Sequence, residues 1–189
     1  DYIDIYQLHG GTIDDPIDEV IEAFEILKRQ GKIKQYGISS IRPNVIAEYA
    51  RRSDIVSVML QYNILDRRPE EKVLPQLSSD GIGVVARGAL AKGITIKSTS
   101  IDYLDYNHKY VDLLKDKINV FSIEERSNIQ TIVRWVLHNK MVTSAVIGIR
   151  NIEQLDEILG TINSPLLNQK EYKALSNVLV PNRYSQHRG

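Results

Sequence analysis

Strand-like and helix-like segments alternate along the 189 residues of this chain, and no other feature restricts its fold as much. Apolar alternation predicts a strand at residues 3–8, and the Asp-Asp-Pro sequence at residues 14–16 is typical of a helix start. Helical periodicity then continues to Gln30, and Gly31 is placed to end that helix. The same order repeats, with strands expected at residues 33–39, 55–60, 82–86 and 143–147, and helices at residues 43–52, 70–79, 123–140, 152–160 and 168–179.

Five strands joined by helices predict a parallel sheet covered by helices, which places the chain in the α/β class. Two architectures share this pattern. A doubly wound open sheet is complete with five strands, whereas a (β/α)8 TIM barrel needs eight strands and about 250 residues. No Gly-x-Gly-x-x-Gly turn follows any predicted strand, so the nucleotide-binding version of the open sheet has no support. A barrel is possible if this chain supplies only part of it.

The middle of the chain has the weakest pattern. The segment from Gly93 to about Phe121 is rich in Ser, Thr, Asp, Asn and Tyr, so we expect an excursion with one short helix. Ser122 and Glu125 stand three residues apart, which is the spacing of a capping box, and they predict the start of the helix at residues 123–140. Farther on, Asn151 can cap the helix that runs through residue 160.

Charge and composition exclude several classes of partner. Lys and Arg together number 24, as do Asp and Glu, so the chain has no basic excess with which to bind nucleic acid. No run approaches the roughly 18 apolar residues of a membrane span, and no His, Asp or Glu set recurs at metal-ligand spacing. The absence of cysteine fits a reducing compartment. We therefore expect a cytoplasmic protein with no metal and no membrane or nucleic-acid partner.

Polar residues follow the end of every predicted strand. They are His9 after the first strand, Ser39 and Ser40 after the second, Gln61 and Asn63 after the third, Arg87 after the fourth and Arg150 after the fifth. Barrels keep their functional residues at the carboxyl ends of the strands, so these side chains are candidates for a common site. Each one taken singly is also compatible with capping a helix or solvating a loop.

The sequences around these residues are more specific than the residues themselves. DYIDIYQLH at residues 1–9, GKIKQYGISS at 31–40, QYN at 61–63, GVVARGALAKG at 83–93 and VIGIRNIEQLDE at 146–157 resemble, in order and spacing, strands four to eight of aldo/keto reductases. The resemblance implies a (β/α)8 barrel to which residues 1–189 contribute about five strands. This chain would then be the C-terminal part of a single barrel domain, with the front of the barrel absent from it.

The resemblance also implies a reaction. In this family a Tyr, polarised by a Lys and an Asp, protonates the carbonyl oxygen of an aldehyde or ketone while NADPH delivers a hydride to the carbon. His9 matches the family's His, which hydrogen-bonds that oxygen; the alternative is a His that caps or packs against the next helix. The Asp, Tyr and Lys would precede Asp1, so none of the ten tyrosines is assigned as proton donor. The segment alone is expected to be inactive.

Four of the candidates correspond to the family's nicotinamide site. Ser39, Ser40 and Gln61 align with the residues that hydrogen-bond the nicotinamide carboxamide, although Ser40 replaces the usual Asn. Arg87 takes the position at which many members stack a Tyr on the nicotinamide, and a planar guanidinium can stack in the same way. The alternative for Arg87 is a surface salt bridge.

The remaining candidates correspond to the other half of NADPH. Leu90, Ala91 and Gly93 would contact the pyrophosphate through backbone N–H groups, and Gly148 belongs to the loop that grips the cofactor. Arg150 is placed to bind the adenosine 2′-phosphate, which would favour NADPH over NADH. Contacts to the adenine are implied for two residues at helical spacing, Gln154 and Glu157, whose alternative is a solvated helix face.

Two other interpretations stay open. The family includes noncatalytic relatives such as potassium-channel β subunits, so the chain is also similar to an NADPH-binding redox sensor or regulatory subunit. A self-sufficient five-strand α/β domain with an unrelated ligand is the third interpretation. A partial barrel would leave its first and fifth strands unpaired. We therefore expect either the N-terminal part of the same barrel or another copy of the chain along those edges.

Overall fold

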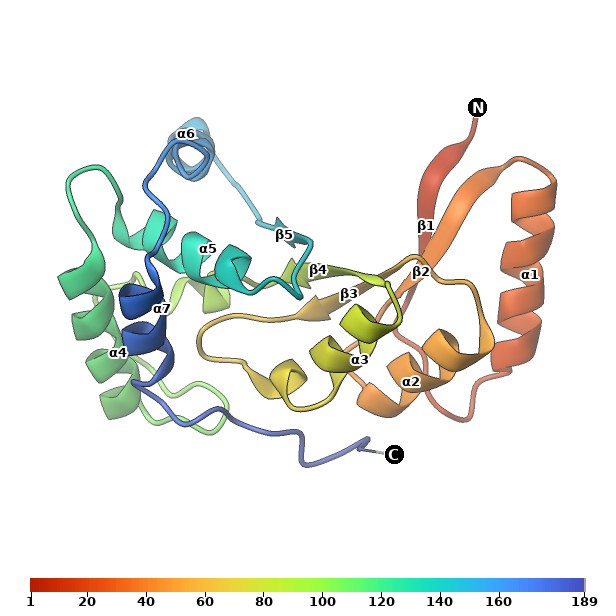
Figure 1. Cartoon of the computed structure of the whole chain (residues 1–189), viewed down its shortest axis with the longest axis horizontal. Helices are drawn as coiled ribbons and strands as arrows, with labels where there is room; N and C mark the ends of the chain where they lie inside the picture. The colour runs from red at the N-terminus through yellow and green to blue at the C-terminus, as the bar shows by residue number, and fades with distance from the viewer. Residues whose placement is uncertain (189) are drawn as a thin grey trace. The chain divides into compact units, whose positions relative to one another are not determined.

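The computed structural model describes residues 1–188, which form five strands and seven α-helices (Figure 1). The strands are β1 (Ile3–His9), β2 (Ile33–Ser39), β3 (Ser57–Gln61), β4 (Gly83–Arg87) and β5 (Ser144–Val146). Their order in the sheet is β1-β2-β3-β4-β5, and β2 pairs in parallel with both β1 and β3. The prediction of five strands in an α/β chain is confirmed.

The helices are α1 (Ile17–Arg29), α2 (Pro43–Arg52), α3 (Val73–Ser79), α4 (His108–Phe121), α5 (Asn128–His138), α6 (Ile152–Gly160) and α7 (Gln169–Ser176). Pro16 directly precedes α1, as its missing N–H favours. Gly31 follows the helix with a φ of +68°, a conformation that glycine adopts without a steric penalty. Both β2 and α2 have the bounds that the sequence predicts.

The chain gathers into two compact units. Unit 1 holds residues 1–60, residues 69–85 and the tail from Arg183, and so contains β1, β2, α1, α2, α3 and most of β3 and β4. Unit 2 holds residues 61–68 and 86–182, with β5 and the helices from α4 to α7.

The core of unit 1 forms where α1 covers β2 (Figure 1). The rings of Phe24 on α1 and Tyr36 on β2 stack with centroids 4.9 Å apart, and both side chains are buried. The Tyr36 hydroxyl donates to Glu25 Oε1 at 2.7 Å, which satisfies the polar end of the buried ring. On β1, in contrast, Ile3 and Ile5 are each about half exposed.

One position of β2 accepts only glycine. A Cβ atom on Gly37 would lie 2.3 Å from the carbonyl oxygen of Ser57 on β3, a distance that real side chains do not reach. The side chain of Gln7 on β1 reaches the same residue of β3, and its Nε2 donates to Ser57 Oγ at 3.0 Å. Gly37 therefore lets a polar contact form between the strands on either side of β2.

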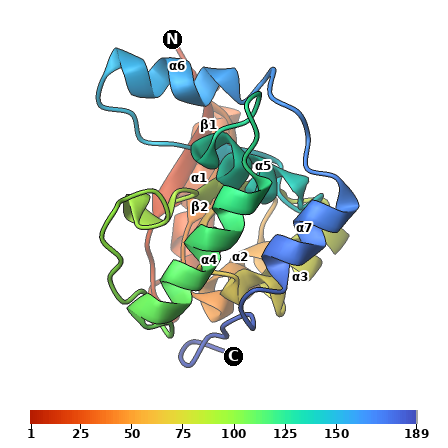
Figure 2. The same cartoon turned by 90° about the vertical axis from the view of Figure 1, so that its left-hand side faces the viewer.

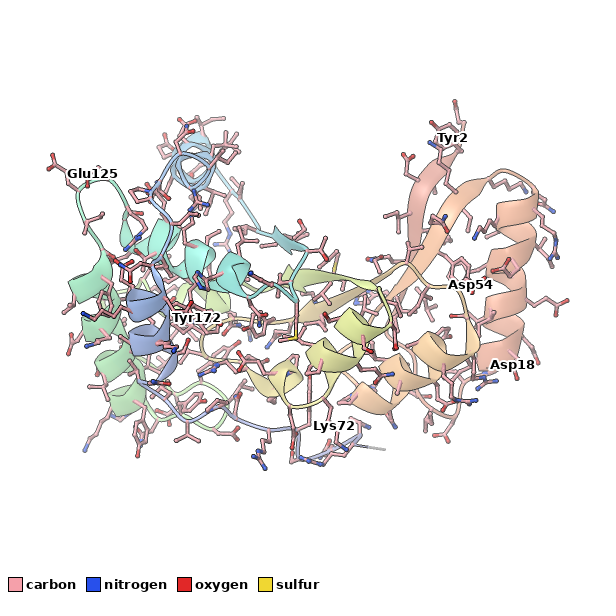
Figure 3. The ribbon with its side chains drawn as sticks, in the orientation of Figure 1. Tyr2, Asp18, Asp54, Lys72, Glu125 and Tyr172 are labelled. Atoms are coloured by element: carbon pink, nitrogen blue, oxygen red, sulfur yellow. The ribbon has the colours of Figure 1, made fainter. Side chains whose placement is uncertain are left out.

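The core of unit 2 centres on Trp135 of α5, which is fully buried. Its ring stacks on Tyr62 at 5.6 Å and on Tyr172 of α7 at 5.8 Å, and the side chain of Tyr172 is labelled in Figure 3. The indole N–H donates to Ser176 Oγ at 3.0 Å. Trp135 is therefore a core residue of unit 2.

A buried arginine joins three helices of unit 2. Arg126 is 1% exposed, and its guanidinium donates to Glu171 at 2.8 Å and to the carbonyl oxygens of Phe121 at 2.7 Å and Leu166 at 3.1 Å. Phe121 ends α4, Arg126 precedes α5, and Glu171 lies in the first turn of α7. Figure 2 shows α4 and α7 side by side, in the arrangement that this set of hydrogen bonds holds.

The predicted helix at residues 123–140 is wrong at its start. Ser122 terminates α4, and its hydroxyl donates to Ile118 O at 2.9 Å instead of capping a following helix. The capping box belongs to Ser127 and Gln130, so α5 begins at Asn128. The expectation of one short helix before residue 121 is also wrong, because α4 extends over 14 residues.

The observed ends of other elements differ from the predicted ends by a few residues. The segment predicted as a helix at residues 70–79 opens with a 3₁₀ turn at Arg68–Glu70, and α3 begins only at Val73. The last helix ends at Ser176 instead of residue 179, and β3 begins two residues later than predicted. Within residues 1–188, no helix is both long and apolar enough to cross a membrane.

Candidate functional site

Two of the candidate residues lie next to each other at the carboxyl end of the sheet in unit 1. His9 ends β1 and is the register partner of Ser39, which ends β2. The carbonyl oxygen of Ser39 accepts from the N–H of Gly10 at 2.8 Å, so the two strand ends remain paired beyond His9. The His9 side chain is exposed, and it has no hydrogen-bond partner in the part of the chain that the structure describes. The alternative of a helix-capping His is therefore not supported.

Ser40 has a structural task of its own. Its N–H donates to Met59 O at 3.0 Å, and its hydroxyl accepts from the N–H of Arg42 at 3.2 Å, which shapes the turn ahead of α2. Its side chain is 4% exposed. The hydroxyl thus accepts one hydrogen bond from the backbone, and its own O–H remains available to donate.

In unit 2, Gln61 at the end of β3 belongs to a hydrogen-bond network. Its Nε2 donates to Asp66 Oδ2 at 2.7 Å and to Tyr103 Oη at 3.2 Å. Arg68 binds both oxygens of the same carboxylate, with Nε and Nη2 each at 2.7 Å. Asp66 is completely buried, and this bidentate pair supplies its counter-charge.

Arg87 at the end of β4 is half-buried, and its Nε is fully buried without an acceptor among residues 1–188. A buried unpaired donor is costly, so such groups are normally satisfied by a ligand or by water. The surface salt bridge that was the alternative for Arg87 is not found among the ion pairs of the described residues, and the role of this residue at the nicotinamide stays a prediction.

A cavity of about 900 Å³ lies wholly within unit 2. It is bounded by the loop after β4, the exit of β5 and the first half of α6. Six of the sequence candidates line it, namely Leu90, Gly93, Gly148, Arg150, Gln154 and Glu157. The structure thus brings together residues that stand almost 70 positions apart in the sequence.

Three candidates of unit 2 do not line this cavity. Gln61 and Arg87 lie outside its wall, and so does Ala91, whose side chain is 1% exposed. The side chain of Ala91 is buried, and the role expected for this residue, a backbone N–H contact to the pyrophosphate, stays a prediction. Lys92, which stands within the GVVARGALAKG sequence, and Lys97 also line the wall, although neither was a candidate residue.

The loop after β4 has an unusual backbone. Ala91, Lys92 and Gly93 have consecutive positive φ values of 47°, 57° and 76°, a conformation that costs free energy in residues with a side chain. The N–H of Gly93 donates to Leu90 O at 2.7 Å, and the N–H of Ala91 donates to Gly88 O at 2.9 Å. Such strain concentrates at ligand-binding loops, and here it occurs at the wall of the cavity.

The opposite wall is fixed by the start of α6. Asn151 caps the helix by accepting from the N–H of Gln154 at 2.9 Å, as predicted. Gln154 Oε1 in turn accepts from the backbone N–H of Arg150 at 3.0 Å. The carboxylate of Glu157 accepts from the hydroxyl of Ser127, so α6 is joined to the start of α5. Gln154 and Glu157 thus both accept hydrogen bonds within unit 2, although the side chain of Gln154 is exposed.

Among the described residues, Arg150 is fixed by the hydrogen bond of its backbone N–H to Gln154 and not by its side chain. The side chain is exposed at the cavity wall, and its guanidinium forms no ion pair with the residues that the structure describes. Lys92 and Lys97 add two more cations to the wall, against the carboxylates of Glu153 and Glu157. A free guanidinium is suited to bidentate recognition of a phosphate. Residues 1–188 contain no cluster of acidic or His side chains that could hold a metal ion.

Comparison with known proteins identifies the class of this fold and site. The sequence model of the aldo/keto reductase family matches residues 1–179, and the chain belongs to this family of oxidoreductases. Its solved relatives indicate the α/β class and the (β/α)8 barrel fold.

Individual relatives agree with this assignment. The chain is 44% identical over 201 aligned positions to the uncharacterized oxidoreductase YqkF of Bacillus subtilis, covering 100% of this chain and 64% of that protein. It is 42% identical to the holo form of the aldo-keto reductase AKR11C1 of Bacillus halodurans, with a TM-score of 0.90, covering 100% of this chain and 63% of that one. A more distant relative, 26% identical, is the NADH-specific methylglyoxal reductase of Escherichia coli, covering 86% of this chain and 55% of that protein. The chain thus spans less than two thirds of the length of each of these relatives.

Proposed function

We propose that the intact protein reduces an aldehyde or ketone to an alcohol with NADPH, and that this chain supplies His9 and most of the cofactor site. The observation that carries the proposal is the cavity of unit 2, which is lined by six of the candidate residues, among them Arg150, whose guanidinium forms no ion pair within residues 1–188. Its volume of about 900 Å³ falls within the range of small-molecule and cofactor sites, about 300 to 1,000 Å³.

The polar groups of the chain fit the chemistry of NADPH. Arg150 would bind the 2′-phosphate, and the strained loop at residues 88–93 would offer the pyrophosphate a backbone N–H that its internal hydrogen bonds do not use, such as that of Leu90. Gln154 and Glu157 would lie beside the adenine, and Gly148 leaves room for close approach of the loop. The resemblance assigns contacts with the nicotinamide to Ser39 and Ser40 of unit 1 and to Gln61 and Arg87 of unit 2.

His9 is the residue of this chain that we assign to the reaction itself. Bound NADPH supplies a hydride to the carbonyl carbon. A neutral imidazole donor aimed at the carbonyl oxygen stabilises the negative charge that develops there, and this charge is larger in the transition state than in the substrate. The exposed ring at the end of β1 is free to donate in this way.

The same proposal assigns this chain a place in the barrel. We infer that its five strands are the later strands of a (β/α)8 barrel and that the remainder of the protein supplies the other strands with the proton-donating Tyr, its Lys and its Asp. The support is the resemblance of the strand sequences, together with coverage of 63% to 64% of the relatives' lengths.

The test is the consumption of NADPH by the intact protein in the presence of short aldehydes and ketones, with equilibrium binding of NADPH measured in parallel. Binding with turnover is the expected result. Tight binding without turnover on any carbonyl compound would favour the noncatalytic sensor or regulatory subunit. A protein that binds neither NADPH nor NADH would contradict both functions.

A further inference from the structure

The amide of Gln61 has only one orientation that its surroundings allow. Its Nε2 is 2.7 Å from Asp66 Oδ2, and this carboxylate is fully buried and bound by Arg68. An ionised carboxylate can only accept hydrogen bonds, so the amide oxygen of Gln61 cannot face it. The amide nitrogen must therefore point to Asp66, and Oε1 must point away from it.

Tyr103 uses the second hydrogen of the same nitrogen. Its Oη lies 3.2 Å from Gln61 Nε2 and 3.4 Å from Asn63 Nδ2, so it can accept from both amides. The ring is 9% exposed, and burial raises the pKa of Tyr103, which keeps the hydroxyl protonated at neutral pH. Both N–H hydrogens of Gln61 are then occupied within the protein, and a primary amide has no others.

The partners of Gln61 are themselves held firmly. Asn63 is fully buried, donates to Gly88 O at 2.9 Å and accepts from the N–H of Leu65 at 2.9 Å. Gly88 lies over the Gln61 side chain, because a Cβ atom there would be 3.6 Å from Gln61 Cγ. The loop at residues 61–68, the loop after β4 and the segment that carries Tyr103 thus fix one amide between them.

What remains of Gln61 is a single unoccupied acceptor. Its Oε1 receives no hydrogen bond within the described chain and is not fully buried. The Gln61 amide has no hydrogen left to donate to a ligand, because its two N–H hydrogens point to Asp66 and Tyr103. It distinguishes ligands by whether they offer an N–H.

We propose that Asp66 and Tyr103 are positioning residues that fix Gln61 Oε1 as an acceptor, so that the site selects a ligand with a primary carboxamide over one with a ketone or a carboxylate in the same place. The inference rests on the proposed function, because it takes the ligand to be a nicotinamide cofactor. It adds to that function the two side chains, Asp66 and Tyr103, that make the site prefer a carboxamide.

The test compares three ligands on the intact protein. They are NADP⁺, its analogue with a methyl ketone in place of the carboxamide, and its analogue with a carboxylate there. Tyr103→Phe removes one of the two acceptors of the Gln61 amide nitrogen without changing the ring, so the amide is held less firmly, by Asp66 alone. We expect the wild-type protein to bind the carboxamide most tightly. Tyr103→Phe should reduce that preference over the ketone by about 2- to 10-fold, the range of one neutral hydrogen bond.

The control is Tyr106→Phe. Tyr106 belongs to the same segment and is buried to the same degree, at 8% exposed, but its hydroxyl donates to Val180 O and not to Gln61. It should leave the ratio of the two dissociation constants at the wild-type value. A general loosening of the segment would weaken all ligands alike and would not change the ratio.

Gln61→Met supplies a second variant that does not depend on the folding of Tyr103→Phe. It should abolish the preference for the carboxamide, and adding Tyr103→Phe to it should change nothing further, because the two substitutions act through one contact. An unchanged preference for the carboxamide in Gln61→Met, or in a folded Tyr103→Phe protein, would overturn the inference. Binding of NADP⁺ by the same proteins would still support the proposed function. A wild-type protein that binds none of the three ligands would overturn both.

Discussion

Replacing Arg150 by Ala should weaken NADPH without weakening NADH. The guanidinium is exposed and forms no ion pair within residues 1–188, so its removal strands no buried carboxylate. The backbone N–H that binds Gln154 Oε1 is retained by alanine, so the start of α6 keeps its geometry. The loss is then that of a charged hydrogen bond to the 2′-phosphate, about 1.5 to 3 kcal/mol. This corresponds to a rise of roughly 10- to 150-fold in the dissociation constant.

The assay is equilibrium binding of both cofactors to the intact protein at low and moderate salt. The NADPH affinity of the wild type should fall as salt rises, and this dependence should be smaller in Arg150→Ala, because an exposed charge is screened by ions. Arg29→Ala is the matched control, since Arg29 is an exposed arginine in the last turn of α1. Equal weakening of NADPH and NADH by Arg150→Ala would refute the assignment.

Two further substitutions follow from the structure. His9→Asn should lower kcat/KM for carbonyl reduction by tens- to about a thousand-fold with NADPH affinity retained, as measured by steady-state kinetics and binding, and wild-type turnover would remove His9 from the mechanism. Glu171→Ala should lower the free energy of unfolding by about 3 kcal/mol in urea titrations, because it deprives the buried Arg126 of its counter-charge. Burial raises the pKa of Glu171, but hydrogen bonds from Asn168 and Arg126 outweigh it and leave the pKa below 4.5. Because the pKa of Glu171 is lower in the folded than in the unfolded protein, the ion pair stabilises the fold above the unfolded pKa, and this stabilisation is lost as the pH falls through the folded pKa. The difference in unfolding free energy between wild type and Glu171→Ala should therefore shrink below about pH 4. A difference that stayed constant into acid would contradict the ion pair.

The strands and the first helices could be predicted because their signals are local. Residues 33–39 contain the strand-favouring residues Ile33, Tyr36 and Ile38, and Pro43 starts a helix, so β2 and α2 appear with the predicted ends. The start of α5 could not be chosen in the same way. Ser122 with Glu125 and Ser127 with Gln130 both have capping-box spacing, and only the fold selects the second, where Ser127 also binds Glu157.

The candidate site likewise has residues that the sequence predicts and residues that it does not. Motif residues such as Arg150 and Gln154 line the cavity because the loop that carries them has a fixed length between β5 and α6. Tyr103 stands 42 positions from Gln61, and nothing in the sequence marks it as a partner. The positive φ of Ala91 is a property of the folded loop, which the alanine side chain does not reveal.

Hydrogen–deuterium exchange of the intact protein with and without NADPH tests most directly whether the cavity of unit 2 holds the cofactor. Bound cofactor should slow exchange in two segments that are far apart in the sequence, residues 88–97 and residues 147–158, because these form the cavity walls. Arg150→Ala should weaken this protection at a fixed NADPH concentration. Tight NADPH binding that left both segments unprotected, with protection elsewhere in the chain, would contradict the account.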